Sequence, residues 1–400
     1  MGGCRVLIPV ANPVGGIRTY LIYNLKRLHE AGYRFTFLAP AGEGFETLKK
    51  DTVSWEGTEY IDIPGGKKEG LSAIRHTLRT QQFDLIHSQG IHFGTLVSLV
   101  NYFRQTPHLI TLHNVVVPDQ NLFGRFASLK KRLAAFVTRR ASCIIPVSCD
   151  CEANYLETFP AWKKGPVHVT AIRHGIDVSL LEHSREQFEI DRQPNLREQF
   201  GIGNNVLLGG FFGRFMPEKG FDIVLKALAL LAERGYRDRF HVVATVDANG
   251  YRQETLRDTA ANSDVSKMVH FLPAVPIIAP LLLQTDVLIM PSRWEACGLL
   301  AMESLVLGTP VIGSDCLGLR EVLSGTPAVV VPRDDPEALA DAVASFVDNP
   351  QPAKDAAKNY FADAGKRFDV NIAVEQLLGL YQSFTANKTL RKPGALVKEI

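Results

Sequence analysis

The sequence has few cysteines and no long hydrophobic run. Its six cysteines show no CxxC spacing, and Cys149 and Cys151 stand too far from histidines or further cysteines to form a zinc site. No apolar run reaches about 18 residues, so the sequence predicts no transmembrane helix. The beginning, MGGCRVLIPV, lacks the regions of a signal peptide. We therefore expect a cytoplasmic protein with reduced, mostly buried thiols.

An excess of one charge is also missing. The formal net charge is +2, and Lys plus Arg minus Asp plus Glu gives 22 − 17 = +5 for residues 1–190 and 22 − 25 = −3 for residues 191–400. A nucleic-acid-binding protein would carry a dense basic face with aromatic side chains that stack on bases. We therefore predict no nucleic-acid partner.

What the sequence does contain is a repeated alternation of strands and helices. Short apolar runs such as CRVLIPV, FTFLAP and SCIIPVS alternate with amphipathic stretches, and a second series runs from NVLLGGFFGR to AVVVP. This predicts an α/β protein with doubly wound parallel sheets. Four hundred residues also exceed what one core usually organises, so we expect two domains. The expected parts are an N-terminal Rossmann-like domain (1–185), a second one (186–365) after a polar linker at 182–205, and a helical tail (366–400) that packs back on the first.

Two facing domains of this kind usually bind ligands in the cleft between them, at the carboxyl ends of their strands. Gly15 and Gly16 follow the first strand and open the first helix, where glycines let backbone N–H groups approach an anion. The structural alternative is a tight turn without a ligand. The G-x-G-x-x-G spacing is missing, so a dinucleotide fingerprint is not indicated.

Two cations follow the first strand of the second series. Arg214 and Lys219 offer a guanidinium fork and a point charge, a combination that suits a pyrophosphate. The alternative is a surface pair that neutralises Glu218 and Asp222.

Two glutamates, Glu295 and Glu303, interrupt the apolar stretch PSRWEACGLLAMESLVLGTPVIGSD. We expect Glu295 on a loop and Glu303 one turn inside a helix that starts near Gly298. Eight helical residues would separate them by ~12 Å, whereas the carboxylates of a glycoside hydrolase lie roughly 5–9.5 Å apart. The loop could permit the shorter distance, so a hydrolase stays open, but a longer span suits two carboxylates that hold separate hydroxyl groups of one ligand. The amides at the helix start offer an anion site between them.

These motifs together resemble glycosyltransferase family 4, which has the GT-B fold. The resemblance rests on E-x7-E, R-x4-K and the double glycine, each after a strand, and on HN at 113–114, HGID at 174–177 and GLREV at 318–322. The EACGL run is also similar to glycogen synthase-like relatives. The resemblance implies a retaining glycosyltransferase that uses a UDP-, GDP- or ADP-linked sugar without a metal or other cofactor, and the chain has no Asp-x-Asp. The acceptor would be a sugar or glycolipid in cell-surface glycan biosynthesis.

The resemblance also implies roles for single residues. Glu303 would bind the ribose hydroxyls, and Glu295 the hydroxyls of the transferred sugar. Arg214 and Lys219 would stabilise the leaving diphosphate, and His113 would lie beside the reacting centre. The expected catalytic residues are His113, Glu295, Arg214 and Lys219, and the expected donor-binding residues are Gly15, Gly16, Arg214, Lys219, Val275, Glu295, Cys297, Gly298, Leu299, Leu300 and Glu303.

The chain departs from the family pattern at three sites, and other functions remain possible at this stage. His174 stands where the family usually has Asn, and Leu317 and Pro273 stand where it usually has Gly. His174 and Leu317 could reshape the sugar pocket. The alternatives are a nucleotide-sugar epimerase, a phosphorylase with bound pyridoxal phosphate, and a non-catalytic sugar-binding subunit.

A basic amphipathic segment, residues 121–140 (NLFGRFASLKKRLAAFVTRR), carries apolar residues at helical spacing with six cations between them. Such a helix can lie on an anionic membrane and present the enzyme to a lipid-linked acceptor. The alternative is a helix with its apolar stripe in the core and its charges in water.

Overall fold

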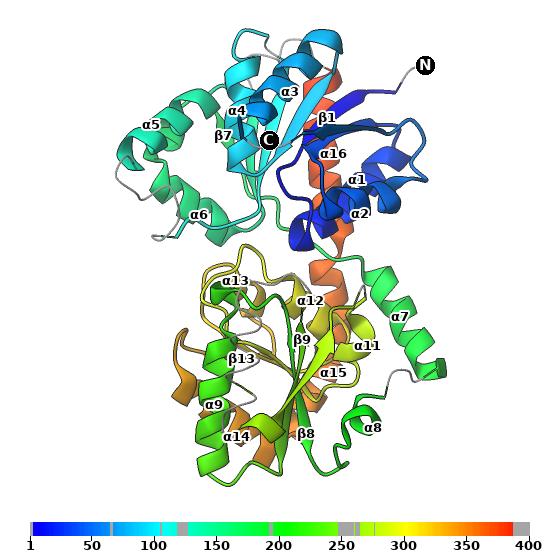
Figure 1. Cartoon of the computed structure of the whole chain (residues 1–400), viewed down its shortest axis with the longest axis vertical. Coiled ribbons are helices and arrows are strands. Elements are labelled where there is room, and N and C mark those ends of the chain that lie inside the picture. Colours follow the sequence, from blue (N-terminus) through cyan, green and yellow to red (C-terminus); the bar gives the residue numbers. More distant parts are fainter. Residues whose placement is uncertain are drawn as a thin grey trace. The chain divides into compact units, whose positions relative to one another are not determined.

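The computed structural model describes residues 3–64, 67–104, 106–117, 127–191, 195–246, 260, 265–275 and 277–386. The chain forms two compact units, each built around one parallel sheet (Figure 1). Unit 1 comprises Met1–His174 and Val370–Ile400, and unit 2 comprises Gly175–Asp369. Among the described residues, no helix combines the length and apolar character needed to cross a membrane.

Unit 1 contains a seven-stranded parallel sheet in the order β3-β2-β1-β4-β5-β6-β7. The strands β1, β2, β4, β5 and β6 are almost entirely buried, as expected for apolar strands that helices cover on both faces. The strands are β1 (Arg5–Pro9), β2 (Arg34–Pro40), β3 (Glu59–Ile63), β4 (Leu85–Gln89), β5 (His108–Leu112), β6 (Cys143–Pro146) and β7 (His168–Val169). The helices are α1 (Gly15–Glu30), α2 (Glu43–Thr52), α3 (Lys67–Thr80), α4 (Ile91–Asn101), α5 (Ala127–Thr138), α6 (Cys149–Thr158) and α16 (Val370–Ala386).

The last described helix, α16, completes the core of unit 1. It packs against α1, and Leu377, Tyr381 and Phe384 are at most 1% exposed within the same hydrophobic cluster as β1 and β2. The preceding helix, α15 (Gln351–Phe368), belongs to unit 2. The chain therefore leaves unit 1 after His174 and returns to it at Val370.

Unit 2 contains a six-stranded parallel sheet in the order β10-β9-β8-β11-β12-β13. The strands are β8 (Leu207–Phe212), β9 (Phe240–Val246), β10 (Val269–Pro273), β11 (Val287–Met290), β12 (Val311–Ser314) and β13 (Val329–Val331). The helices besides α15 are α7 (Val178–Asp191), α8 (Leu196–Phe200), α9 (Phe221–Glu233), α11 (Ala279–Leu282), α12 (Leu299–Val306), α13 (Leu319–Leu323) and α14 (Pro336–Asp348).

The predicted α/β class with two parallel sheets is confirmed, and two details differ. The segment 182–205 is not a plain linker, because α7 and α8 occupy most of it and α7 packs against α11 and α12. The boundary between the units accordingly lies after His174 and not after residue 185. The edge strand β3, EYIDI, was not predicted, because its partly exposed residues break up the apolar run that marked the other strands.

Candidate functional site

The two charged motifs of unit 2 follow neighbouring strands, at the carboxyl ends of these strands. Arg214 and Lys219 follow β8, Glu295 follows β11, and β8 pairs with β11 in parallel. The carboxyl ends of parallel strands are where open α/β sheets bind ligands. The R-x4-K loop and the loop that carries Glu295 are therefore neighbours.

Lys219 and Glu295 form an ion pair. The Lys219 Nζ donates to Glu295 Oε1 at 2.6 Å, and the Ser292 hydroxyl donates to the same oxygen at 2.8 Å. Glu295 is only 9% exposed, so its charge needs these partners. The cation expected at the pyrophosphate and the carboxylate expected at the sugar thus lie in direct contact.

Two glycines let the loops approach this closely. Gly220, with φ +72°, follows Lys219, and a Cβ there would collide with the carbonyl oxygen of Pro291. Gly318, with φ +76°, lies under the Glu295 backbone, and a Cβ would collide with the Glu295 carbonyl oxygen and stand 2.8 Å from the Ala296 carbonyl carbon. The backbone at both positions favours glycine for its conformation and for the space.

Arg293 connects the same loops through hydrogen bonds, and the sequence did not predict a role for it. Its guanidinium donates to both carboxylate oxygens of Asp222, at 2.9 and 2.8 Å, and to Asp334 Oδ1 and the Pro217 carbonyl at 2.5 Å each. Hydrogen bonding from Arg293 lowers the pKa of Asp222. Arg293, and not Arg214 or Lys219, therefore neutralises Asp222, which counts against the surface-pair alternative for that carboxylate.

Glu303 lies on α12, whose first residue follows Gly298. Burial of its carboxyl group raises the pKa to about 7, and we find no hydrogen bond or ion pair to this carboxyl group in the described part of the chain. A desolvated carboxyl group without a protein partner is suited to a ligand that brings hydrogen-bond donors.

The remaining residues expected at the donor have distinct environments. Arg214 is exposed, and we find no ion pair that engages it within the described part of the chain. Gly298 caps α12 with φ +65°, and Cys297 is buried. The amides of Leu299 and Leu300 begin α12, where helical N–H groups lack intrahelical partners. Val275 is 39% exposed after β10.

In unit 1, His113 contacts α1, the helix that begins with the double glycine. Gly15 and Gly16 are exposed at the start of α1, and there is open space where a Cβ of Gly15 would stand. One turn later, the Tyr20 ring meets His113 edge-on with ring centroids 4.8 Å apart. The His113 Nε2 lies 2.7 Å from Gln89 Oε1, and burial lowers the pKa of His113 well below its usual value. The imidazole is therefore neutral at pH 7.

A buried polar chain stands behind His113. The Tyr381 hydroxyl lies 2.7 Å from His87 Nδ1, and His87 Nε2 lies 2.6 Å from the Thr111 hydroxyl, which is 3.3 Å from that of Tyr20. Burial lowers the pKa of His87 to about 3, so His87 is a neutral structural residue. The adjacency of β4 and β5 could have indicated the Gln89–His113 contact, whereas no sequence signal linked Tyr381 to it.

Comparisons with known proteins agree with these motifs. Residues 14–180 match the family described as Glycosyltransferase Family 4, and residues 192–363 match Glycosyl transferases group 1. A D-inositol 3-phosphate glycosyltransferase of Thermobispora bispora is 27% identical over 86% of this chain and 84% of its own length. A 2-deoxystreptamine N-acetyl-D-glucosaminyltransferase of Streptomyces fradiae is 30% identical over 80% of this chain and 73% of its own length.

Solved structures share the fold. The structure of Anabaena HepE in complex with UDP and glucose aligns with a TM-score of 0.77 at 21% identity, and the alignment covers 95% of this chain and 100% of that one. A sucrose-phosphate synthase of Thermosynechococcus elongatus aligns with a TM-score of 0.76 at 18% identity, covering 96% of this chain and 99% of that one.

Proposed function

The chain belongs to glycosyltransferase family 4 and has the predicted GT-B fold, and from this premise we propose a retaining enzyme that uses a nucleotide sugar without a metal. The arrangement of charges in unit 2 carries the proposal. Beyond the carboxyl ends of β8 and β11 lie the exposed cation Arg214, the Lys219–Glu295 pair and the carboxyl group of Glu303, which has no partner among the described residues. This set suits a ligand with both phosphates and hydroxyl groups.

Each group has a place in the reaction. Arg214 and Lys219 would hold the pyrophosphate and stabilise the charge that develops on it as the sugar leaves. Fixed cations of this kind can supply the charge that a divalent metal supplies in other sites. Glu303 would accept hydrogen bonds from the ribose hydroxyls, and Glu295 from the sugar. The roles expected for Gly15, Gly16 and His113 in unit 1 stay predictions.

Retention of configuration fits the state of Glu295. A covalent glycosyl-enzyme intermediate would need an oxygen of Glu295 as the nucleophile, whereas Lys219 and Ser292 hold its Oε1 in an arrangement that suits the role proposed for this carboxylate, as the acceptor of hydrogen bonds from the sugar. We therefore infer that the acceptor hydroxyl attacks the anomeric carbon from the face that the diphosphate leaves. The new C–O bond forms as the C–O bond to the phosphate breaks, and the hydroxyl proton passes to the departing phosphate oxygen.

The identity of the substrates rests on the relatives. HepE was crystallised with UDP and with UDP-glucose, which makes a UDP-sugar the first donor to test. The curated relatives are named for D-inositol 3-phosphate and 2-deoxystreptamine, and both names describe hydroxylated rings. We propose a hydroxylated ring, of a sugar, glycolipid or cyclitol, as the acceptor; a role in cell-surface glycan synthesis stays a prediction.

The decisive experiment follows the anomeric proton by NMR. The enzyme is incubated with α-linked UDP-, GDP- and ADP-glucose, a panel of sugar and cyclitol acceptors, and EDTA. We expect an α-linked product that forms as fast with EDTA as with added Mg²⁺. A β-linked product would contradict retention, and activity that needs added metal would contradict metal independence. Epimerised donor without acceptor, or glucose 1-phosphate formed from a glucan and phosphate, would favour the epimerase or the phosphorylase.

We also propose that unit 1 contacts anionic membranes through α5. Part of the predicted segment, residues 121–126, lies outside the described residues, but α5 itself exposes an apolar row: Leu129 is 65%, Leu133 60% and Phe136 49% exposed. The neighbouring α4 adds Leu99 and the following Phe103, which are 52% and 88% exposed. The sequence of α5 has no acidic residue and three consecutive cations. Ala134, Ala135 and Val137 are buried, so α5 has both a core-facing side and an exposed apolar row, and the exposed row supports the membrane proposal.

Vesicle binding tests the membrane proposal. The wild type should co-sediment with phosphatidylglycerol vesicles but not with phosphatidylcholine vesicles, and salt should weaken the binding. The Leu133→Gln/Phe136→Gln variant should lose it. Ile190→Gln, which alters a residue of α7 that is 74% exposed, is the matched control and should bind like the wild type. Equal binding by all three proteins would contradict a role for α5.

A further inference from the structure

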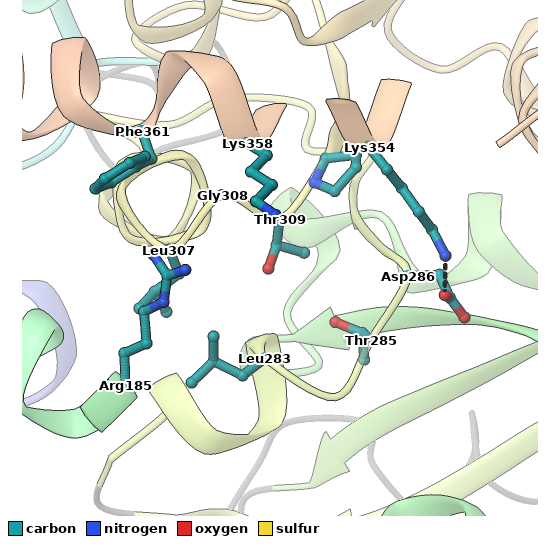
Figure 2. Close-up of a pocket in the computed structure, with 11 residues that line it drawn as sticks. Arg185, Leu283, Thr285, Asp286, Leu307, Gly308, Thr309, Lys354, Lys358 and Phe361 are labelled. Atoms are coloured by element: carbon teal, nitrogen blue, oxygen red, sulfur yellow. Dashed lines mark hydrogen bonds and ion pairs between the residues drawn. The ribbon is translucent and has the colours of Figure 1, made fainter. Parts of the chain in front are cut away.

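Unit 2 contains a cavity at the amino ends of its strands, on the side of the sheet opposite to the carboxyl ends that the charged motifs follow. It has a volume of ≈ 310 Å³, near the lower end of the range of small-molecule sites. Thr285 and Asp286 in its wall directly precede β11, and Thr309 stands just before β12, whereas Glu295 follows β11. Helices α7 and α15 complete the wall with Arg185, Lys354 and Lys358 (Figure 2). The cavity is therefore separate from the candidate donor site.

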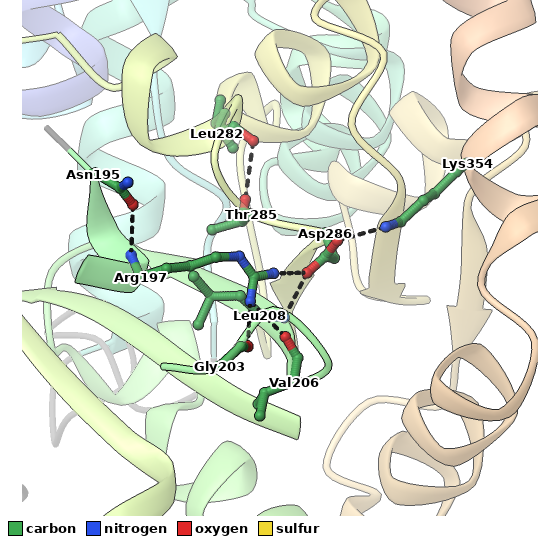
Figure 3. Close-up of polar contacts among 9 residues, drawn as sticks. All are labelled: Asn195, Arg197, Gly203, Val206, Leu208, Leu282, Thr285, Asp286 and Lys354. Carbon is green, nitrogen blue, oxygen red and sulfur yellow. Dashed lines mark hydrogen bonds and ion pairs between the residues drawn. The ribbon is translucent and has the colours of Figure 1, made fainter. Parts of the chain in front are cut away.

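The charge of this wall is positive. Three cations and one carboxylate line it, which gives 3 − 1 = +2. The carboxylate, Asp286, is fully engaged: Lys354 donates to its Oδ1 at 2.5 Å, and Arg197 and the Leu208 amide donate to its Oδ2 at 2.8 and 2.7 Å (Figure 3). Asp286 thus pairs with Lys354 in the wall and with Arg197, which does not line the cavity, so no wall carboxylate remains to compensate the other two wall cations.

Those two cations are Arg185 and Lys358. Arg185 approaches Glu189 at 3.6 Å, but that carboxylate is 69% exposed, and such a surface pair compensates charge weakly. The Arg185 guanidinium also lies over the Phe361 ring, 5.4 Å from its centroid, which keeps it at the wall of the cavity. Lys358 is exposed, and within the described part of the chain we find no ion pair for its ammonium group.

The uncharged wall is suited to a hydroxylated carbon skeleton. The Thr285 and Thr309 hydroxyls both donate to the Leu282 carbonyl, at 3.0 and 3.1 Å. Their protons are therefore used, and their oxygen lone pairs remain as acceptors for ligand hydroxyls. Leu307 and Phe361 supply apolar surface beside them.

We propose that this cavity binds a small phosphomonoester of a hydroxylated compound. Arg185 and Lys358 hold the phosphate, whose charge of about −2 at neutral pH matches the two uncompensated cations. The hydroxyl groups of the ligand donate to Thr285 and Thr309. This site is independent of the proposed donor chemistry, because none of the residues assigned to the donor lines it.

Calorimetric titration with glucose 6-phosphate as the probe tests the proposal. The proteins are the wild type, the Arg185→Gln/Lys358→Gln variant and, as a control at the carboxyl ends of the strands, Arg214→Gln; each is titrated with and without saturating UDP. We expect the wild type and Arg214→Gln to bind alike, with or without UDP. The double variant should bind at least about ten-fold more weakly, because it loses two charge-assisted contacts.

Two further titrations define the ligand class. Glucose should not bind, and inorganic phosphate should bind more weakly than glucose 6-phosphate. An unchanged affinity in the double variant, or loss of binding with UDP or in Arg214→Gln, would overturn the assignment of this cavity, as would a wild type that does not bind. Equal affinity for inorganic phosphate would overturn the role of the threonine wall. Matching urea unfolding midpoints of the three proteins exclude misfolding as the cause.

Discussion

The carboxyl group of Glu303 has no hydrogen-bond or ion-pair partner among the described side chains. Its pKa is raised to about 7 by burial, so the folded state binds this proton more tightly than the unfolded state does. The stability that the neutral group contributes is fully present below the unfolded value of 4.5 and is lost as the pH rises to about 7 and above. Conflict between stability and a ligand-binding charge is typical of functional sites.

Replacement of this carboxyl group should separate stability from binding. At pH 8, Glu303→Gln should raise the free energy of unfolding by about 2–3 kcal/mol, because it removes a desolvated charge. The gain should vanish near pH 5, where the wild-type group is already neutral. Donor affinity of the wild type should rise between pH 6 and 8, whereas that of the variant should be weaker and insensitive to pH.

Urea titrations and calorimetry at several pH values measure both quantities. Glu186→Gln, which alters an exposed residue of α7, is the control and should change neither. A pH dependence of donor affinity that survives in Glu303→Gln would show that another group titrates.

At the scale of elements, the loop after β11 depends on glycine. Gly318 and Gly235 both have positive φ, +76° and +85°, but a Cβ would collide with the Glu295 backbone only at Gly318, and at Gly235 it would meet open space. Either change to Ala strains the backbone by roughly 1–2 kcal/mol. Only Gly318→Ala should also displace Glu295.

We therefore expect Gly318→Ala to lower kcat/KM by roughly 10–100-fold, the range that small displacements of catalytic groups produce. Gly235→Ala should lose similar stability but keep its kcat/KM. Steady-state kinetics and urea unfolding compare the two. Equal kinetic losses would mean that backbone strain, and not the position of Glu295, limits activity.

The elements also show how far the sequence alone could lead. The buried strands and the motifs after β1, β8 and β11 were predictable, because continuous apolar runs and charged residues behind them are local patterns. Arg293 was missed because its partners Asp222 and Asp334 lie far away in sequence, and a surface arginine carries no local signal. The sequence predicts a linker at 182–205, because the packing of α7 against α11 and α12 depends on tertiary contacts that no local pattern shows.

At the scale of the whole molecule, the two units differ in continuity. Unit 2 is one continuous segment, Gly175–Asp369, whereas unit 1 needs α16 from the far end of the chain. Because Leu377, Tyr381 and Phe384 are at most 1% exposed in that core, their loss would leave large cavities. Each such residue typically contributes about 2–5 kcal/mol, against a total stability of about 5–15 kcal/mol.

Fragments should reveal this difference. Residues 175–369 alone should fold cooperatively and bind the nucleotide, because Arg214, Lys219, Glu295 and Glu303 all belong to it. Residues 1–174 alone should not fold, and a version with residues 370–386 attached through a flexible linker should fold. Circular dichroism and urea titration check each fragment, and cooperative unfolding of residues 1–174 alone would contradict the role of α16.

The central claim is that unit 2 binds a nucleotide sugar through its own side chains. Its most direct test is calorimetric titration of the full chain with UDP-, GDP- and ADP-glucose in the presence of EDTA, for the wild type and Arg214→Ala, with Arg234→Ala as a surface control. We predict that one donor binds the wild type and the control equally, and binds Arg214→Ala at least about ten-fold more weakly, since a charge-assisted contact is lost. Equal affinity in all three proteins, or no binding of any donor, would contradict the claim.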